Sequence, residues 1–527
     1  SLTRAMGDVS FDHQGRRIQG MRMQNTGDVY AVNGWEAMPY DNHSGIVDIY
    51  RNCKGNPSTF TYYTQPLYVA VSPRTQFVHL PGKVPVDFYI VNEKNLSGKY
   101  RLSVSVCTPD GKEGKHIEKE VHITGGDCFG QLLLENCHLA IEGASGLYQV
   151  KAQLRNTSGH LCAEGKDEVL GIYWDEKQLK GKGALYGTPD DPVATFYQKA
   201  TGCELPAFRS DMEKLDWIVV TRSSLDAPQP VPVEAFCQKE GKSVLELSLY
   251  KDDDLRTLAG VTQDNKIDRT FADGAQPDPL LPANQSFSAI WDGKLKAPQS
   301  GTYMIGVTSD QGMRLSVNGQ RIVDEWRNNK ELTVVRPFLL KAGDEVAVRV
   351  EYSQRNPTGS VQLVWSLPDH AAIAPQELLD RVREDGTSLL LLKSAESWMD
   401  AVSAYTGSAY HGYYSVGKNW VGGVHFVKEH PLFNGLPVNV AMGWPYQALV
   451  RNGDRRLGLH IDNEELVAGS YSSAPFNLGS AVGIISCGKG KIYYSTLDLV
   501  DNLNNPAAAA DVARKLFCNF ILLSKDR

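Results

Sequence analysis

Residues 28–52 have the sequence DVYAVNGWEAMPYDNHSGIVDIYRN, and this segment decides how the chain is interpreted. It opens with the apolar run VYAV at residues 29–32, which is short enough for a buried β-strand. The preceding residues 15–25 have the apolar spacing of a helix. A helix followed by a buried strand, with polar and aromatic residues crowding the carboxyl end of that strand, is typical of one unit of a (β/α)8 barrel.

The segment GWEAMPYDNHSGIVDIYRN at residues 34–52 resembles the end of the catalytic barrel in family 2 glycoside hydrolases, the group of β-galactosidases, β-glucuronidases and β-mannosidases. The resemblance implies that residues 1–55 are the C-terminal remnant of a TIM barrel and contain its last strand. It also implies a retaining mechanism on β-linked glycosides that uses two glutamates. In the family these glutamates lie on earlier strands, and no matching segment is present here. No catalytic residue is therefore assigned, and whether this chain alone is an enzyme stays open.

The same resemblance supplies candidate substrate-binding residues, namely Trp35, Glu36, Asn42 and His43. Trp35 matches the aromatic residue that floors the subsite of the cleaved sugar, although a Trp at a strand end is otherwise slightly more often part of a core. Glu36 is interpreted as a hydrogen-bonding or structural residue rather than the nucleophile. Asn42 and His43 either reach the substrate or are satisfied within the exit loop.

Length, charge and cysteine spacing limit the functional classes. A chain of 527 residues predicts three or four domains, and the net charge of −7 predicts no nucleic-acid partner. The sequence contains no run of 18 apolar residues, so no membrane span is expected. The nine cysteines are scattered singly, which predicts neither a zinc site nor a disulfide framework. No metal or cofactor is predicted.

Residues 56–174 predict an immunoglobulin-like β-sandwich. Alternating segments such as 67–71, 86–91, 100–106 and 146–152 are separated by turn sequences and not by helices. This agrees with the sandwich that follows the barrel in family 2 enzymes, where a structural role is expected.

Residues 183–262 and 370–527 predict one α/β domain with a parallel sheet, because strand-like and helix-like segments alternate. The helices are expected at 191–201, 231–240, 375–384, 396–405 and 507–522, and buried strands at 215–220, 243–247 and 388–392. The segments HPLFNGLP at 430–437 and GKGKIYYST at 488–496 resemble class I glutamine-amidotransferase-like domains. Cys487 lacks the glycine that precedes a nucleophilic cysteine and leads into a strand, so a hairpin turn with a buried thiol is favoured. The domain is interpreted as non-catalytic scaffold or as an oligomerisation surface.

Residues 263–369 interrupt this α/β domain with alternating strands and the hairpin signal Asn318-Gly319. Trp291, Tyr303, Asn318-Gly319, Trp326 and Trp365 carry a resemblance to PA14 domains. The resemblance implies an inserted β-sandwich of a kind that often binds carbohydrate or shapes access to it.

Four residues of this segment are candidates for carbohydrate binding, namely Asp310, Gln311, Trp326 and Asn328. Sugars present apolar C–H faces to aromatic rings and hydroxyls to carboxylates and amides, so a binding loop needs both. Asp310 and Trp326 are balanced between a structural and a binding role. Calcium is not expected, because Ser309-Asp310 stands where the calcium-dependent adhesins have two aspartates.

The sequence therefore predicts a multidomain α/β plus all-β protein with two functional interpretations. The first is the C-terminal portion of a family 2-like glycoside hydrolase with an accessory PA14 module, located in the periplasm or secreted. The second is a non-catalytic carbohydrate-binding or assembly protein. Both name a glycan as the partner, and both leave a homo-oligomer open.

Overall fold

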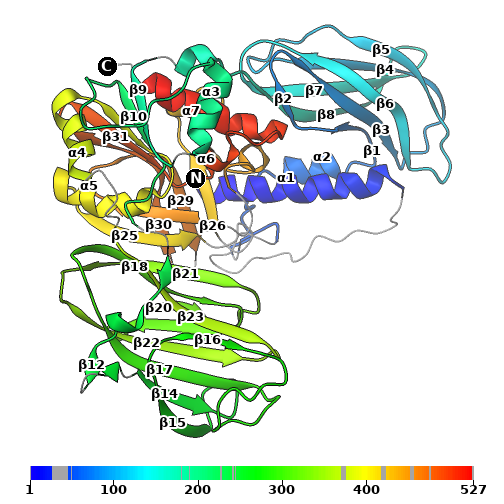
Figure 1. Cartoon of the computed structure of the whole chain (residues 1–527). Coiled ribbons are helices and arrows are strands. Elements are labelled where there is room, and N and C mark those ends of the chain that lie inside the picture. Colours follow the sequence, from blue (N-terminus) through cyan, green and yellow to red (C-terminus); the bar gives the residue numbers. More distant parts are fainter. Residues whose placement is uncertain are drawn as a thin grey trace. The chain divides into compact units, whose positions relative to one another are not determined.

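The computed structural model describes residues 2–25, 45–48, 50–179, 181–188, 190–225, 228–239, 242–243, 245–368, 375–416, 423–450, 456–473 and 476–524. The chain divides into two compact units (Figure 1). Unit 1 comprises Ser1–Arg222 and Ala374–Arg527, and unit 2 comprises Ser223–Ile373. The inserted segment expected from residue 263 therefore begins earlier in this division, because residues 223–262 also belong to unit 2.

A long helix, α1 (Leu2–Met23), opens unit 1 and is followed by α2 (Ser58–Tyr63). The helix expected at 15–25 is thus present and begins earlier. Its buried positions Phe11, Ile18 and Gln19 share one face. The strand expected at 29–32, and with it the barrel assignment, lies outside the described residues.

Two sheets form the β-rich part of unit 1, and their strands are antiparallel except that β2 pairs with β8 in parallel. One has the order β1-β3-β6, with β1 (Leu67–Pro73), β3 (Gly82–Asn92) and β6 (Gly130–Ile141). The other has the order β2-β8-β7-β4-β5, with β2 (Phe77–His79), β4 (Gly98–Cys107), β5 (Ile117–Ile123), β7 (Gly146–Arg155) and β8 (Leu161–Ile172). Alternate residues of β7 are buried, and both sheets contribute to one apolar core.

Arg16 on α1 forms a bidentate ion pair with Asp167 on β8, at 2.7 and 2.9 Å. The Asp167 side chain is only 5% exposed. Arg16 also meets Asp12 one turn away at 2.9 Å, where the carboxylate is more exposed. The Arg16–Asp167 pair therefore ties the helix to the sheet beneath it.

The remaining sheet of unit 1 has the order β27-β26-β29-β30-β31-β24-β10-β9, and β25 and β28 extend it. Its strands are β9 (Gly183–Tyr186), β10 (Trp217–Val220), β24 (Ser388–Leu391), β25 (Tyr410–Val416), β26 (Gly423–Val427), β27 (Val440–Ala441), β28 (Arg456–Ile461), β29 (Glu465–Ser473), β30 (Phe476–Cys487) and β31 (Gly490–Ser495). The helices are α3 (Pro192–Thr201), α4 (Pro375–Asp380), α5 (Met399–Thr406), α6 (Leu499–Asn502) and α7 (Asp511–Leu523).

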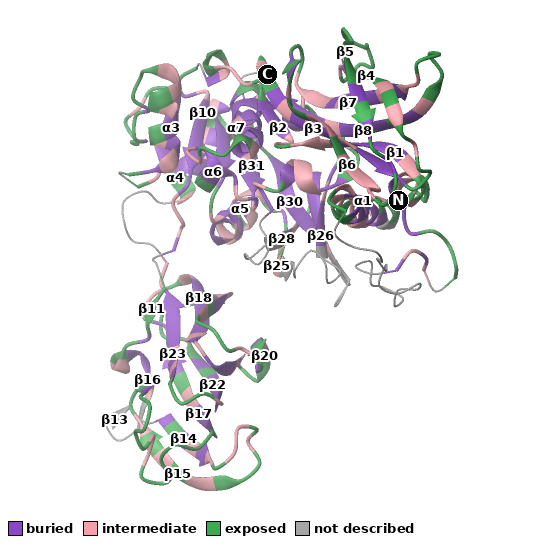
Figure 2. Cartoon of the chain, turned by 90° about the vertical axis from the view of Figure 1, so that its right-hand side faces the viewer, coloured by how far each residue is buried: buried purple, intermediate pink, exposed green. Residues whose placement is uncertain are grey.

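Strands β9, β10, β24 and β31 are parallel, as the alternation of strand and helix predicts. The strands from β25 to β30 pair antiparallel, so the sheet is mixed and the expected parallel sheet is only part of it. Trp217 and Val219 on β10 join a core with Phe196 of α3 and Phe517 of α7. On the other face Tyr186 packs edge-on against Trp398, just before α5, with ring centroids 5.9 Å apart. Figure 2 shows β10 and β31 coloured mainly as buried.

Unit 2 is a β-sandwich. Its first sheet has the order β11-β23-β18-β21, with β16 also paired to β23, and contains β11 (Gln229–Pro230), β16 (Asp268–Phe271), β18 (Gly301–Ser309), β21 (Leu332–Leu340) and β23 (Gly359–Ser366). Its second sheet has the order β15-β14-β17-β22-β19-β20, with β14 (Leu245–Tyr250), β15 (Leu258–Asp264), β17 (Phe287–Lys296), β19 (Gly312–Val317), β20 (Gln320–Glu325) and β22 (Glu345–Gln354). A short hairpin of β12 (Gln238–Lys239) and β13 (Lys242–Ser243) precedes β14 in the sequence.

The two ends of unit 2 are paired with each other. Leu225 forms a β-bridge with Pro368, and Gln229 on β11 pairs with Trp365 on β23. The chain thus enters and leaves unit 2 at one place, so the unit can replace a loop between β10 and α4 without forcing these two elements apart.

Two expected elements differ in this region. The helix expected at 231–240 is absent from the described residues there, which contain instead a 3-10 turn at Val233–Ala235 and the strand β12. Pro230 and Pro232 hold the residues before them in extended conformations, and Val231 donates its N–H to Leu363 on β23 at 3.0 Å. The strand expected at 243–247 is β14, which pairs with β15 and β17 of unit 2.

Asp167→Asn is expected to lower the free energy of unfolding of unit 1 by about 3 kcal/mol, because it removes the buried carboxylate that pairs with Arg16 and leaves that guanidinium only its more exposed partner Asp12. Urea denaturation of the whole chain measures this change. The matched control is Asp12→Asn, which removes the more exposed partner and should cost less than about 1 kcal/mol. Equal effects of the two substitutions would contradict the role given to the buried pair.

Candidate functional site

Four loops meet at one end of unit 2, namely those between β14 and β15, β18 and β19, β20 and β21, and β22 and β23. The candidate residues of the unit lie in the second and third of these loops. Asp310 and Gln311 lie between β18 and β19, and Asn328 lies between β20 and β21. The Nδ2 of Asn328 donates to the carbonyl oxygens of Ser309 and Gln311, both at 3.2 Å. The structure therefore brings these predicted residues together.

The polar groups of these loops bond to the loop between β22 and β23. Asp310 Oδ1 accepts the N–H of Ser360 at 2.7 Å. Gln311 Oε1 accepts the N–H of Arg355 at 3.2 Å, and its Nε2 donates to the carbonyl of Thr358 at 3.1 Å. The amide of Gln311 is thus used within the fold, and sugar contact by Asp310, Gln311 or Asn328 stays a prediction.

Trp326 is 7% exposed, and its ring is covered by cations. The Arg314 guanidinium lies 4.3 Å from the ring centroid and that of Arg355 lies 5.9 Å from it. The indole Nε1 donates to Asp254 Oδ1 at 3.2 Å. These contacts give Trp326 a structural role in the conformation described, where a sugar would have to displace a cation to stack on the ring.

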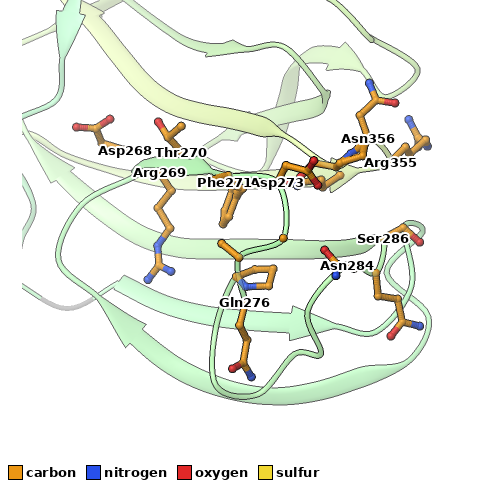
Figure 3. Close-up of a pocket in the computed structure, with 17 residues that line it drawn as sticks. Asp268, Arg269, Thr270, Phe271, Asp273, Gln276, Asn284, Ser286, Arg355 and Asn356 are labelled. Atoms are coloured by element: carbon orange, nitrogen blue, oxygen red, sulfur yellow. Dashed lines mark hydrogen bonds between the residues drawn. The ribbon is translucent and has the colours of Figure 1, made fainter.

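A pocket of about 770 Å³ adjoins these loops (Figure 3). Its walls are strand β16, the irregular segment 272–286 that follows it, and residues 354–357. Phe271 and Phe287, at the two ends of that segment, pack edge to face with centroids 5.0 Å apart. Tyr352 stacks on Phe271 at 5.5 Å. The segment therefore leaves and returns at one point, as in an Ω-loop.

Internal contacts give this segment, which we call the 272–286 loop, a defined shape. Leu281 is 2% exposed and joins the core of the unit. The Nε2 of Gln276 donates to the Leu281 carbonyl at 2.8 Å, and the N–H of Leu281 donates to the Asp278 carbonyl at 2.9 Å. The loop is thus anchored at its middle as well as at its ends.

Several polar side chains of the pocket have no hydrogen-bond partner among the residues that the structure describes. They are Thr270, Asp273, Asn284, Gln285, Ser286 and Asn356. Figure 3 shows that they come from both sides of the pocket. Together they offer one carboxylate, three amides and two hydroxyls to a ligand.

The arginines of the pocket are paired instead. Arg269 Nε meets Asp264 Oδ2 at 2.8 Å, and Arg355 Nε meets Asp253 Oδ2 at 3.0 Å. Asp268 bonds to Lys266 at 3.0 Å, and this hydrogen bond is the main cause that lowers the pKa of its carboxyl. Asp273 is the charged group of the lining that has no such partner among the described residues.

Asp252 shapes the loop that carries Asp253 and Asp254. Partial desolvation acts to raise the pKa of Asp252, but hydrogen bonds from the N–H groups of Arg256, Thr257 and Asp254 outweigh it and lower the pKa to about 2. Because Asp253 binds Arg355 and Asp254 binds Trp326, this carboxylate supports the loop end next to the pocket.

The candidate residues outside unit 2 are either not among the described residues or buried. Trp35, Glu36, Asn42 and His43 lie outside the described residues. Cys487 lies at the end of β30, pairs with Gly490 across the turn to β31, and is 4% exposed. Burial raises the pKa of its thiol, which disfavours the thiolate that a nucleophile requires.

Sequence reasoning missed the 272–286 loop as the wall of a pocket. Its sequence ADGAQPDPLLPANQS is rich in Gly, Pro, Asn and Asp and has no periodicity, so it indicates only a loop. Its length was the available signal, because irregular loops of this size are often functional.

The comparisons with known proteins concern this unit above all. The PA14 domain family matches residues 241–378, so unit 2 contains a PA14 domain. Among curated proteins, the anti-sigma-I factor RsgI3 of Acetivibrio thermocellus is 29% identical over 117 residues, which are 22% of this chain. The chain spans only 18% of the length of that relative.

Solved structures with some likeness include three of different kinds. An anti-sigma factor domain-containing protein from Clostridium clariflavum has 16% identity, a TM-score of 0.23, and coverage of 57% of this chain and 94% of its own. A β-glucosidase from Kluyveromyces marxianus in complex with glucose has 15% identity, a TM-score of 0.23, and coverage of 42% and 29%. The epithelial adhesin 9 A domain from Candida glabrata, in complex with Galβ1-4GlcNAc, has 12% identity, a TM-score of 0.20, and coverage of 28% and 92%. These scores are too low to support an argument about the chain.

Two further findings hold for the described ranges. No helix there is both long and apolar enough to cross a membrane. No three His, Cys, Asp or Glu side chains there are grouped so that they could hold a metal ion.

Asp252→Asn is expected to lower the thermal midpoint of unit 2 at neutral pH, because an amide oxygen accepts the three N–H bonds more weakly than a carboxylate. The folded pKa of about 2 lies below the unfolded value of about 3.9. The carboxylate therefore stabilises the unit above pH ~4, and this contribution is lost as the pH falls from about 4 to about 2. Melting curves of wild type and variant across this range should converge at the acid end. A constant gap would contradict the assignment.

Proposed function

We propose that the PA14 unit binds carbohydrate in the pocket walled by the 272–286 loop. The observation that carries this proposal is the ring of polar side chains without protein partners around one pocket of a PA14 domain. A sugar offers hydroxyls that both donate and accept, so it can satisfy a carboxylate and several amides at once.

The physical balance favours a polar ligand of this kind. Polar groups that lose water without gaining hydrogen bonds cost free energy, so an apolar ligand would be rejected by these walls. Phe271 lies at the floor and supports the loop from below, since it is buried against Phe287 and Tyr352. The pocket volume of about 770 Å³ is in the usual range for sites that hold small molecules.

For the whole chain, we propose the C-terminal portion of a family 2-like glycoside hydrolase that acts on β-linked glycosides. Support comes from the resemblance of residues 34–52 to the end of the family's catalytic barrel, and from the β-sheets that follow it. In this proposal the parent enzyme retains stereochemistry with two glutamates, and it acts in the periplasm or outside the cell. The amidotransferase-like α/β part is non-catalytic scaffold, for which the buried thiol of Cys487 is support.

A second candidate function is a non-catalytic carbohydrate-binding or assembly protein. The observation that favours it is the 29% identity over 117 residues with a protein that is named an anti-sigma-I factor. The PA14 pocket would have the same role in both proposals.

Asn284→Ala and Asn356→Ala are each expected to weaken glycan binding by the whole chain by about three- to tenfold, because each removes one amide from the pocket wall. Isothermal titration with a panel of neutral oligosaccharides measures this. The matched control is Gln263→Ala, an exposed amide on β15 that does not line the pocket. If the control weakens binding as much as the pocket variants, the sugar binds elsewhere.

Hydrolysis of nitrophenyl β-glycosides separates the two whole-chain proposals. A chain extended upstream through the whole open reading frame is expected to cleave one member of the panel, whereas the 527-residue chain is expected to cleave none. Activity in the shorter chain would contradict the proposal that the catalytic glutamates lie upstream. Inactivity of both would favour the non-catalytic protein.

A further inference from the structure

The charged side chains around the pocket differ in how far neighbouring groups compensate their charge. Four charged residues line it, two acidic and two basic, namely Asp268, Asp273, Arg269 and Arg355. Their ion pairs, and not their number, determine which of them can attract or repel a bound sugar. Each is therefore considered with its partners.

Both arginines are held by carboxylates behind the pocket wall. Asp264 binds Arg269 at 2.8 Å and also accepts the indole N–H of Trp291 at 3.1 Å, so its position is fixed on two sides. Arg355 binds Asp253 at 3.0 Å and donates to the Trp326 carbonyl at 2.8 Å. A guanidinium has five N–H donors, so these bonds leave some of them free, but the positive charge of each arginine is compensated by its carboxylate.

The acidic residues differ from each other. Asp268 lies between Lys266 Nζ at 3.0 Å and Gln362 Nε2 at 3.0 Å, so its charge is largely compensated. Asp273 lies on the exposed part of the 272–286 loop, and no ion pair or hydrogen bond engages it within the described ranges. The pocket therefore presents one uncompensated negative charge.

We propose that the pocket selects neutral glycans over acidic ones, and that Asp273 is the residue that makes this selection by accepting hydrogen bonds from sugar hydroxyls. A carboxylate oxygen pair accepts two hydroxyl hydrogen bonds from a neutral sugar. A uronate or a sulfated sugar brings a second negative charge to the same place, where like charges repel. This inference rests on the proposed function, because it concerns the ligand of that same site.

The test uses pairs of glycans that differ in one group. For each pair the probes are a neutral methyl β-glycoside and the corresponding uronate, in the gluco, galacto and manno series. Titration of the whole chain at low salt should show the neutral member binding about fivefold more tightly, as expected for one exposed like charge near contact distance. The difference should disappear at about 1 M salt, where the Debye length is about 3 Å.

Asp273→Asn should remove the difference between the two members of a pair and weaken binding of the neutral one, since a neutral amide neither repels the uronate nor accepts hydroxyls as strongly. The matched control is Glu331→Gln, which removes an exposed charge outside the pocket lining and should leave the difference unchanged. Thermal melting of each variant checks that it is folded.

The outcomes are distinct. Equal or tighter binding of the uronate by the wild type overturns the selection while leaving carbohydrate binding intact. A difference that persists in Asp273→Asn overturns the role of that residue. No binding by any neutral member overturns the proposed function itself, and the selection with it.

Discussion

The pairing of β10 with β24 is the constraint on which the α/β part of unit 1 depends. These adjacent parallel strands are separated in sequence by the whole of unit 2. Closing a flexible loop of that length would carry a large entropic cost. The bridge between Leu225 and Pro368 offsets this cost, since it holds the two ends of unit 2 together once that unit has folded. Folding of the PA14 unit and completion of the parallel sheet are therefore coupled by chain geometry alone.

The pocket depends on a loop whose two ends are also held together, at a smaller scale than those of unit 2. Phe271 and Phe287 close the ends of the 272–286 loop, and Leu281 fixes its middle to the core. Of the side chains that this loop contributes to the pocket wall, Asp273, Asn284, Gln285 and Ser286 make no hydrogen bonds within the described residues, whereas Gln276 bonds to Leu281 and supports the fold. Stability and recognition are thus assigned to different residues of one segment. The adjoining loops differ, because Gln311 and Trp326 use their polar groups within the fold.

Much of the β-structure could be predicted from the sequence, because its signals are local. The Asn318-Gly319 turn joins β19 and β20, with both residues at positive φ as such a turn requires. The helix expected at 231–240 was wrong, because the pairing of Val231 with β23 outweighs a local helical pattern. The burial of Trp326 was also beyond sequence reasoning, since it depends on Arg314 of β19 and on Arg355 of the loop after β22. The residues of the pocket wall follow no period at all, so only their geometry identifies them.

The closed ends of the 272–286 loop have an evolutionary consequence. Because Phe271 and Phe287 hold the ends of the loop and Leu281 anchors its middle, substitutions at the exposed positions between these anchors need not disturb either sheet. The entropic cost of closing a loop also grows slowly with its length, so length changes between these anchors carry a small thermodynamic penalty. This architecture allows the ligand preference to diversify among descendants while the sandwich is inherited unchanged.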